Sequence, residues 1–417
     1  MRSAWISVWL GLVLLVATTQ VAAGTGVASG PHYRLYLDAD RSVNLPSAEA
    51  IRMGVETALA MAGSPPGAPR FEVVPRDHRA NVKRSLLTMR AFLEDEAALA
   101  VIGGIHSPPY LRNNDFINDN GVLMLLPWSA AGPITRPARQ PNWIFRLSVD
   151  DSKAGAFMVS DALDRRGCRT PYLLLLDSGW GRFNGQQMVA ALAARGVEHA
   201  GEDYYKRGID AYTARSTARR IAGQEVDCVL FIGTVLESRL FFEAIAELAP
   251  GVRVSSHWGI AGGRFPSTVS HARREAIGLQ FLHTCFPFDP AARGVFEAEV
   301  AATARALFPE AFDRFETLPA AIGFVHAFDL TRLMLAAMAE VEPGADIAET
   351  RARLRAALET VAGPVQGLMR RWVRPFGAYA PDRPDAHEAL GAGDLCMVRY
   401  GPKGEIQSVP GGSRTER

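Results

Sequence analysis

Cysteine is scarce in this chain, and charge of one sign is never in excess. Among 417 residues there are 4 cysteines, and none of them stands at the spacing of a zinc site. The 45 Lys and Arg residues balance the 44 Asp and Glu residues, leaving a formal net charge of +1. The composition therefore carries no general attraction to nucleic acid or to an anionic membrane surface. We expect neither partner, and we predict no metal and no other cofactor.

Recognisable catalytic motifs are also missing. The chain has no dinucleotide-binding G-x-G-x-x-G after a predicted strand, no phosphate loop and no H-E-x-x-H. The stretch GGIHSPP lacks the second glycine of the hydrolase elbow G-x-S-x-G, because a proline stands there. His106 and Ser107 are neighbours at a predicted helix start, so their side chains point in different directions. A hydrolase using Ser107 remains an alternative, but the pattern favours a protein that binds without catalysis.

The first residues are typical of a cleavable secretory signal. A basic start at Arg2 is followed by an apolar run from Ile6 to Ala17 and by the small-residue pattern VAA that ends at Ala23. The run is about a dozen residues, whereas a membrane-spanning helix needs roughly 20. We expect a signal peptide over residues 1–23, with a second candidate cleavage site after Ala28. An uncleaved anchor is the alternative; cleavage would leave a periplasmic protein with no segment inserted in the membrane.

In an exported protein the cysteines can form disulfides, and four of them allow three connectivities. Buried free thiols are the alternative. The residues concerned are Cys168, Cys228, Cys285 and Cys396.

Hydrophobic residues make up 48% of the chain, and they alternate between strand-like and helix-like patterns. A strand candidate at 32–37 precedes a helical pattern over 46–61, and the couplet recurs up to a proline-rich break at 135–142. The alternation then restarts, with helical patterns over 154–165, 186–195 and 211–222 and an apolar strand over 228–233. Three further helical segments and a hairpin follow. Continuous apolar strands separated by amphipathic helices indicate an α/β protein with two doubly wound, mainly parallel sheets.

Polar and aromatic residues gather directly after the predicted strands, where open parallel sheets bind ligands. Asp38 and Asp40 are candidates for ligand binding, and turn or helix-capping roles are the alternative for both. Ser107 is also a candidate, and its alternative role is to cap a helix starting at Pro108. Trp180 and Trp258 are expected to form a loop-exposed aromatic wall rather than part of a core. The remaining candidates are His106, Trp128, Ser129, Ala130, Thr234, Glu237 and His257.

Six motifs occur in a characteristic order: VIGGIHS, FINDNGVLMLLPWSAA, NWIFRLSVDD, LLLLDSGWGRFN, SSHWGIAGG and HAFDLTRLML. Between Tyr33 and Phe376 the chain resembles the type I periplasmic solute-binding proteins, specifically the branched-chain amino acid (leucine/isoleucine/valine) binding group of ABC transporters. The resemblance implies two Rossmann-like lobes joined by three crossovers. They would close on a small-molecule solute and deliver it to an ABC permease in the inner membrane. A ligand sensor that docks on a membrane receptor or kinase is the alternative.

On this resemblance we expect lobe 1 to comprise residues 32–147 and 284–370. Lobe 2 would comprise 148–283 and 371–408, and 409–417 would form a disordered tail. The ligand would lie in the cleft between the lobes, and the protein would be a monomer.

The resemblance also assigns roles to individual positions. Ser107 matches the serine that holds the ligand carboxylate at a helix start. The segment Trp128, Ser129 and Ala130 matches the backbone and hydroxyl that complete this carboxylate site, although the family's Thr hydroxyl is replaced here. Trp180 matches an aromatic residue of the second lobe.

Two positions depart from the family pattern. Thr234 stands where the family has a further aromatic residue, and Trp258 stands where it has the acid that pairs with the ligand's amino group. Burying an ammonium without a carboxylate is costly. A plain aliphatic amino acid would therefore require a substitute carboxylate from Asp38, Asp40 or Glu237.

The three tryptophans of the predicted cleft, Trp128, Trp180 and Trp258, indicate a flatter, aromatic or otherwise apolar ligand with one acidic or polar end. A cationic ligand held by the indole faces is the competing hypothesis.

Overall fold

The computed structural model describes Met1, residues 30–63 and residues 65–410. The expected signal peptide at 1–23 lies outside this part of the chain, and so do residues 411–417 of the expected tail. Val409 was placed in that tail, but it is only 5% exposed and packs in the core. The ordered part of the chain therefore extends beyond the expected end at residue 408.

Lobe 1 is built on a five-stranded parallel sheet with the order β2-β1-β3-β4-β5. The central strand β3 reads ALAVIG and is buried along its whole length, as expected for a strand covered on both faces. The strands are β1 (His32–Ala39), β2 (Arg70–Asp77), β3 (Ala98–Gly103), β4 (Met124–Leu126) and β5 (Ile144–Arg146).

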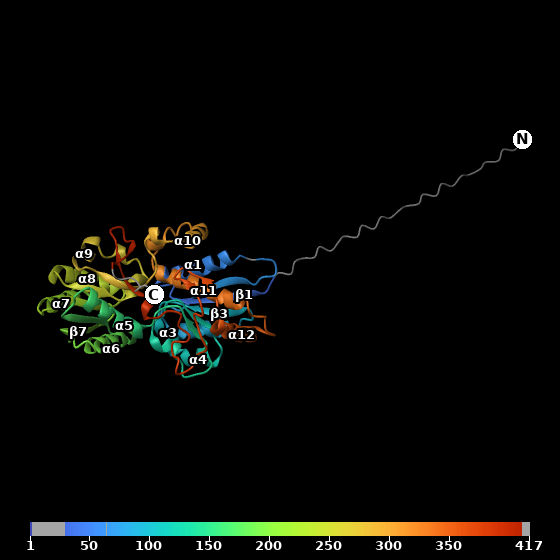
Figure 1. The fold of residues 1–417 in the computed structure, drawn as a ribbon, viewed down its shortest axis with the longest axis horizontal. Coiled ribbons are helices and arrows are strands. Elements are labelled where there is room, and N and C mark those ends of the chain that lie inside the picture. Colours follow the sequence, from blue (N-terminus) through green and yellow to red (C-terminus); the bar gives the residue numbers. More distant parts are fainter. Residues whose placement is uncertain (2–29, 64, 411–417) are drawn as a thin grey trace.

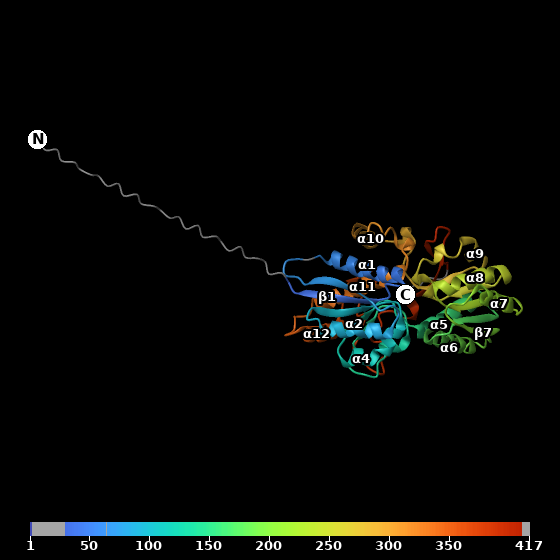
Figure 2. The same ribbon diagram turned by 180° about the vertical axis from the view of Figure 1, so that it is seen from behind.

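Helices from both halves of the chain cover this sheet, and Figures 1 and 2 show them on its two sides. α1 and α11 pack closely: a Cβ added at Gly54 would lie 2.3 Å from the carbonyl oxygen of Phe324. The helices are α1 (Leu45–Ala62), α2 (Val82–Glu94), α3 (Ser107–Arg112), α4 (Asn114–Asp119), α10 (Val295–Leu307), α11 (Ala321–Met338) and α12 (Ile347–Thr360).

Within the described residues, α11 alone has the length and apolar composition of a membrane span. It is nevertheless 83% buried inside the protein, so its apolar surface is explained by the core of lobe 1.

Lobe 2 is built on a seven-stranded sheet with the order β14-β13-β10-β9-β8-β6-β7. The strands β6 to β10 run parallel, and β13 and β14 add an antiparallel edge. These strands are β6 (Pro171–Leu176), β7 (Gly201–Tyr205), β8 (Cys228–Ile232), β9 (Arg253–Ser256), β10 (Gln280–Thr284), β13 (Leu395–Tyr400) and β14 (Ile406–Ser408).

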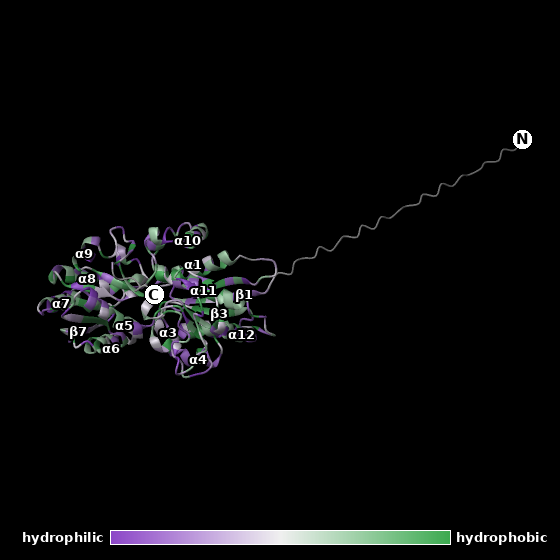
Figure 3. Cartoon of the chain, viewed as in Figure 1, coloured by the Kyte–Doolittle hydropathy of each residue, from purple (hydrophilic) through white to green (hydrophobic). Residues whose placement is uncertain are grey.

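The helices of lobe 2 lie in the left half of Figure 1, away from β1 and α12 of lobe 1. In Figure 3 the outer helices of both lobes carry hydrophilic as well as hydrophobic residues, as helices that cover a sheet on one side should. They are α5 (Asp151–Ser160), continued by a π turn over Asp161–Arg165, α6 (Gly179–Ala193), α7 (Ala211–Ala222), α8 (Val235–Leu248) and α9 (His271–Ala276).

All four cysteines are paired, which overturns the alternative of buried free thiols. Cys168 bonds to Cys228 and so joins the turn before β6 to β8. Cys285 bonds to Cys396 and joins the end of β10 to β13. Both disulfides therefore belong to the secondary structure of lobe 2.

The chain passes between the two sheets three times: from β5 to β6, from β10 to α10, and from β12 (Arg371–Trp372) to β13. β12 pairs with β11 (Val365–Gln366) in a small antiparallel sheet. The two lobes and three crossovers are the architecture that the resemblance implied.

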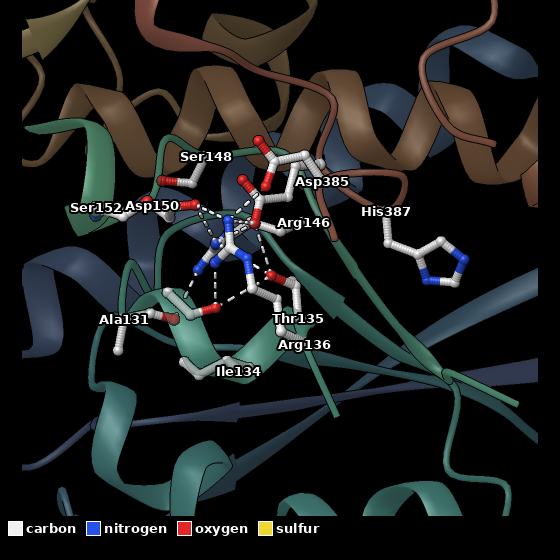
Figure 4. A network of polar contacts seen from close by, with 12 residues as sticks. Ala131, Ile134, Thr135, Arg136, Arg146, Ser148, Asp150, Ser152, Asp385 and His387 are labelled. Atoms are coloured by element: carbon white, nitrogen blue, oxygen red, sulfur yellow. Dashed lines mark hydrogen bonds and ion pairs between the residues drawn. The ribbon is translucent and has the colours of Figure 1, made fainter. Parts of the chain in front are cut away.

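A cluster of opposite charges, buried apart from Asp385, ties the first crossover to the third (Figure 4). Arg146 at the end of β5 lies 2.7 Å from Glu388, which belongs to the third crossover, and 3.3 Å from Asp150, which caps α5. Arg136 lies 2.6 Å from the Asp150 carboxylate and Lys153 lies 2.8 Å from Glu388. Three cations thus balance three carboxylates where the lobes join, the third being Asp385, which also contacts Arg136.

Several elements differ from those expected. The strand β7 was missed because its sequence GEDYY does not alternate cleanly. The helix α6 begins at Gly179, seven residues before the expected helix over 186–195. Gly181 is required inside that first turn, since a Cβ there would lie 1.9 Å from the carbonyl oxygen of Leu176.

Candidate ligand-binding site

Loops at the carboxyl ends of both sheets touch each other between the lobes. The Ser47 hydroxyl donates to the carbonyl of Gly262 at 2.6 Å, and the Asp151 amide donates to the carbonyl of Ala130 at 2.8 Å. A Cβ at Gly262 would lie 3.0 Å from the side chain of Ile105. The lobes are therefore closed on each other, and the side chains discussed below lie at or near this contact.

The loop after β3 is held to the loop after β4 by Ser129 and Ser107. The Ser129 hydroxyl lies 2.6 Å from the carbonyl of Gly104, to which it donates, and the Ala131 amide donates to the Ser107 hydroxyl oxygen at 3.2 Å. Ser107 does not cap the helix as one alternative held. α3 starts at Ser107 itself, with His106 in the capping position. Its O–H proton remains able to donate to a ligand.

His106 and Ser107 face different partners. The His106 Nε2 atom lies 3.0 Å from an Asp40 carboxylate oxygen. Burial raises the pKa of Asp40, but hydrogen bonds from His106 and the Val43 amide outweigh it and hold the pKa below its usual value. Within the described residues, the hydrogen bond recorded for the Ser107 hydroxyl is the one from the Ala131 amide, and the His106 ring is bonded to Asp40 instead.

Asp38 and Glu237 are both buried and are each engaged within their own lobe. The Ser85 hydroxyl of α2 donates to Asp38 at 2.5 Å, and burial raises the pKa of Asp38 to about 6. The Thr234 hydroxyl lies 2.5 Å from the Glu237 carboxylate at the start of α8. These two acids therefore have local roles in the structure.

The tryptophans do not form a loop-exposed wall. Trp258 is 3% exposed, at the start of the 3₁₀ turn Trp258–Gly262, so the expectation of exposure is wrong for it. Trp128 is 1% exposed, and a Cβ added at Gly323 of α11 would lie 2.9 Å from its ring. The closed lobes and the core of lobe 1 provide the contacts that bury them.

Trp180 lies in the first turn of α6 rather than in a loop, and it is partly exposed. Its indole N–H donates to a carboxylate oxygen of Asp151 at 3.3 Å. His257 packs edge-on against both Trp180 and Trp258, with ring centroids 5.1 and 5.0 Å away.

Asp151 is the site residue that sequence reasoning missed. Its side chain is fully buried, and one carboxylate oxygen lies 3.0 Å from His257 as well as near Trp180. The other oxygen, Oδ2, has no hydrogen-bond partner among the described residues. Asp151 lies five residues after Arg146, the end of β5. Examining the polar residues that follow each strand, as was done for the other candidates, would also have found it.

A separate cavity of about 350 Å³ lies away from these residues. It is lined by segments of lobe 2 around Arg264, Arg274 and Tyr400, and by Glu316 to Ala320 of lobe 1. None of the twelve candidate residues of the sequence analysis lines it. Its lining includes basic, acidic and apolar side chains, and the acidic one, Glu316, forms an ion pair with Arg293.

One group of carboxylates has the spacing of a metal site: Asp150, Asp385 and Glu388. Each of them contacts one or more of Arg136, Arg146 and Lys153. Burial raises the pKa of Asp150, but the charge of Arg146 and further hydrogen bonds hold it below its usual value. The cations already neutralise this group.

Residues 39–391 match the family model described as periplasmic binding protein. No curated protein sequence matches significantly.

Solved structures resemble the chain over nearly its whole length. A type 1 periplasmic binding protein from Bordetella pertussis Tohama I is 18% identical, with a TM-score of 0.70 over 91% of this chain and 100% of that one. The substrate-binding protein LivJ from Streptococcus pneumoniae, in complex with isoleucine, is 13% identical, with a TM-score of 0.70 over 91% and 99%.

A solute-binding protein of an ABC transporter from R. palustris, in complex with benzoate, is 18% identical, with a TM-score of 0.69 over 91% and 95%. At these identities the structural likeness shows the fold.

Proposed function

Because the chain belongs to the periplasmic binding protein family, we propose that it is the solute-binding component of an ABC-type importer. One observation carries the proposal: polar and aromatic side chains of both lobes, Ser107 from lobe 1 and Trp180 with Asp151 from lobe 2, lie at or near the contact between the closed lobes. Such a site can enclose a small ligand on all sides once the lobes open and close again.

The solute we propose is a small organic compound, either amino-acid-like or an aromatic carboxylate. The structural neighbours bind isoleucine and benzoate, which represent these two classes. The Ser107 hydroxyl is the proposed donor to the carboxylate, next to the segment 128–130. His106 and Asp40 lie beside it as a hydrogen-bonded pair.

The site of action that we propose is the periplasm, after removal of residues 1–23. The two disulfides support an oxidising compartment. The mature protein should begin at Gly24, which N-terminal sequencing of the exported protein will test. Hinge motion would occur at the crossovers, between a lobe 1 of 32–147 plus 284–370 and a lobe 2 of 148–283 plus 371–408. At two of these boundaries the elements shift the division by a few residues: Thr284 and Cys285 stay with β10 of lobe 2, and β12 (Arg371–Trp372) precedes the third crossover.

Native mass spectrometry of protein purified without refolding tests solute capture. We expect a retained small molecule, and titration calorimetry should then show that Ser107→Ala and Trp180→Ala each weaken its binding by more than about tenfold. Matched controls on α7, Ser216→Ala and Tyr212→Ala, should leave the affinity unchanged. Unchanged affinity in both site variants would place the binding site elsewhere, with the separate cavity as the next candidate.

Cellular uptake tests the transport role. Deleting the gene should abolish uptake of the retained solute. Intact uptake with loss of a cellular response to the solute would instead establish a sensor.

A further inference from the structure

The separate cavity of about 350 Å³ is bounded by both lobes. Residues within 263–274 and 400–406 of lobe 2 form one side of it, and residues 316–320, which precede α11 of lobe 1, form the other. A molecule bound in this cavity would therefore contact both lobes at once, at a place separate from the candidate solute site.

The charged side chains that line the cavity are mainly basic. Four of them are basic: Arg264, His271, Arg274 and Lys403. The acidic lining residue, Glu316, forms ion pairs with Arg293 and Arg314, neither of which lines the cavity. The carboxylate of Glu316 is thus neutralised from outside, and the lining keeps a net positive charge.

Arg274 is a buried cation without a carboxylate. Its side chain is only 3% exposed, and its guanidinium donates to the backbone carbonyls of Pro266, Val269 and Gly401. Among the described residues no carboxylate forms an ion pair with it, and its Nε atom has no hydrogen-bond partner. His271 Nδ1, on the same helix, is a second buried nitrogen without a partner. Burying a charge without a counter-charge is costly, so this position favours an anion.

The other buried arginines of the described chain are better compensated. Arg146 also has a buried Nε without a partner, but its charge is paired with Glu388 at 2.7 Å. Arg351 is bonded to backbone carbonyls, as Arg274 is, but its Nε donates to Ala98 at 2.7 Å. Arg274 lacks both kinds of compensation, and of the three it is the one that lines the cavity.

The first turn of α11 borders the same cavity. Ala320 lines it and directly precedes this 18-residue helix, whose first turn has no side-chain cap. The N-terminus of a helix carries a partial positive charge and N–H groups that have no partner within the helix. This end of α11 therefore adds to the attraction that the basic side chains exert on an anion.

The size and the apolar part of the lining limit what the anion can be. A volume of about 350 Å³ is within the range of small-molecule sites, roughly 300–1,000 Å³. Leu318, Pro319 and Ile406 line the cavity together with the charged residues, and an inorganic ion alone would leave them without contacts. Several cations are better matched by a phosphate monoester, with a charge of about −1.5 to −2 at neutral pH, than by a single carboxylate.

We propose that this cavity is a second binding site, for the phosphate monoester of a small organic molecule, and that the bound ester holds the two lobes closed. Arg264, Arg274 and Lys403 would bind the phosphate, and Leu318 and Ile406 would contact the organic part. A ligand that contacts both lobes binds best to the closed form and shifts the equilibrium toward it. By thermodynamic linkage, the ester and the solute then strengthen each other's binding.

Titration calorimetry of the wild-type protein with phenyl phosphate, phenol and inorganic phosphate tests the site. Phenyl phosphate should bind, phenol should not bind measurably, and inorganic phosphate should bind more weakly because it leaves the apolar lining uncovered. The site is wrong if phenyl phosphate does not bind or if phenol binds as tightly. Equal affinities for the two phosphates would overturn the organic part of the ligand.

Arg264→Ala combined with Lys403→Ala should weaken the binding of phenyl phosphate by about tenfold or more, because two charge-assisted contacts are lost. Both residues are exposed, so their replacement should leave the fold intact, whereas Arg274 binds three carbonyls and is kept. Arg219→Ala combined with Lys206→Ala removes two exposed cations elsewhere in lobe 2 and should leave the affinity unchanged. Equal affinities in the two double variants would contradict the proposal.

Ser107→Ala shows whether the probe binds in the solute site instead. This variant should bind phenyl phosphate as the wild type does, because Ser107 does not line the cavity. A loss of binding in Ser107→Ala would place phenyl phosphate in the solute site and overturn the second site.

The effect on closure is measured through the retained solute, and this step rests on the proposed function. Saturating phenyl phosphate should tighten solute binding by about fivefold or more in the wild type, and the Arg264→Ala/Lys403→Ala variant should lose this gain. An unchanged solute affinity would show that the ester does not hold the lobes closed. If the folded protein captures no solute, the proposed function fails, whereas the phenyl phosphate titration still decides the second site because it requires no solute.

Discussion

Both disulfides lie in lobe 2, whereas the folded state of lobe 1 depends on noncovalent packing, above all of α1 against α11. Near the contact, the loops of lobe 1 are joined to each other by hydrogen bonds, such as that from Ser129 to Gly104, whereas Asp151 of lobe 2 contacts His257 and Trp180. Both lobes have buried polar atoms without a hydrogen-bond partner among the described residues: Asp38 Oδ1 and Trp128 Nε1 in lobe 1, and Asp151 Oδ2 in lobe 2. The lobes therefore differ in how their chains are held together more than in the state of their polar groups.

Removing the disulfide of Cys285 and Cys396 should have the largest effect on this difference. It closes a loop with a sequence separation of 111, for which chain entropy predicts a loss of about 4–5 kcal/mol in the free energy of unfolding. In a Cys285→Ser/Cys396→Ser variant, hydrogen exchange followed by mass spectrometry should accelerate in β10 and β13 and stay slow in β1 and β3. Equal acceleration in both sheets would show that the lobes unfold as one unit.

Arg146→Met should destabilise the junction between the lobes by about 3–5 kcal/mol, because it leaves Glu388 and Asp150 buried with one cation fewer. Urea unfolding followed by circular dichroism measures the loss. Arg195→Met, which removes a surface ion pair with Asp164, is the control and should change little. A stability equal to the wild type in Arg146→Met would mean that the charge cluster does not hold the crossovers together.

The pH dependence of stability should report on lobe 1 through Asp38. Its pKa is about 6 in the folded protein against an ordinary 3.8, so the folded state keeps a proton between pH 4 and 6 that the unfolded chain releases. The contribution of Asp38 to the unfolding free energy therefore falls as pH rises through this window and is level above it. Relative to the wild type, Asp38→Asn should gain up to about 3 kcal/mol between pH 4 and 7.

Urea titrations at several pH values check this prediction, and parallel curves for the two proteins would contradict it. Ser85→Ala sharpens the test. Without the Ser85 hydroxyl, which stabilises the ionised form, the transition should move above pH 6.

Gly54→Ala should have the smallest effect of this series. The added methyl group would meet the Phe324 carbonyl and force α1 away from α11, at a cost of about 1–3 kcal/mol. Thermal unfolding measures it. Gly179→Ala on α6, where nothing lies within 4 Å of the added carbon, should not lower stability. If Gly179→Ala lowered the stability as much as Gly54→Ala does, the close packing of α1 against α11 would not be what makes Gly54 necessary.

The sheet strands and most helices followed from hydrophobic periodicity. The helix over 211–222 was expected with its observed bounds, and the strand at Cys228–Ile232 was recognisable as a continuous apolar run. Elements whose form depends on tertiary contacts were not predictable. α6 was taken to begin late because GWG suggests a loop, and its glycine is explained only by the close approach of Leu176.

The candidate site was predictable as a location but not as a set of contacts. The positions after strand ends led to Ser107 and Trp180. Whether a side chain there faces the opposite lobe depends on partners distant in sequence, such as Ala131 for Ser107. Asp151 was not among the candidates, although it follows Arg146, the end of β5, by only five residues. Its contacts with Trp180 and His257 join positions that are distant in sequence.

The third crossover has a further consequence where it runs beside β5. Arg146 and Glu388 form a parallel bridge there, and the Arg146 amide donates to the carbonyl of His387. β5 is the last strand of its sheet, so this segment covers backbone groups that would otherwise invite another chain. At the opposite edge, β2 carries Pro75 and the charged Arg70, Glu72 and Arg76. One edge of the sheet is covered and the other pairs poorly with a further strand, so the sheet is protected against self-association at both edges.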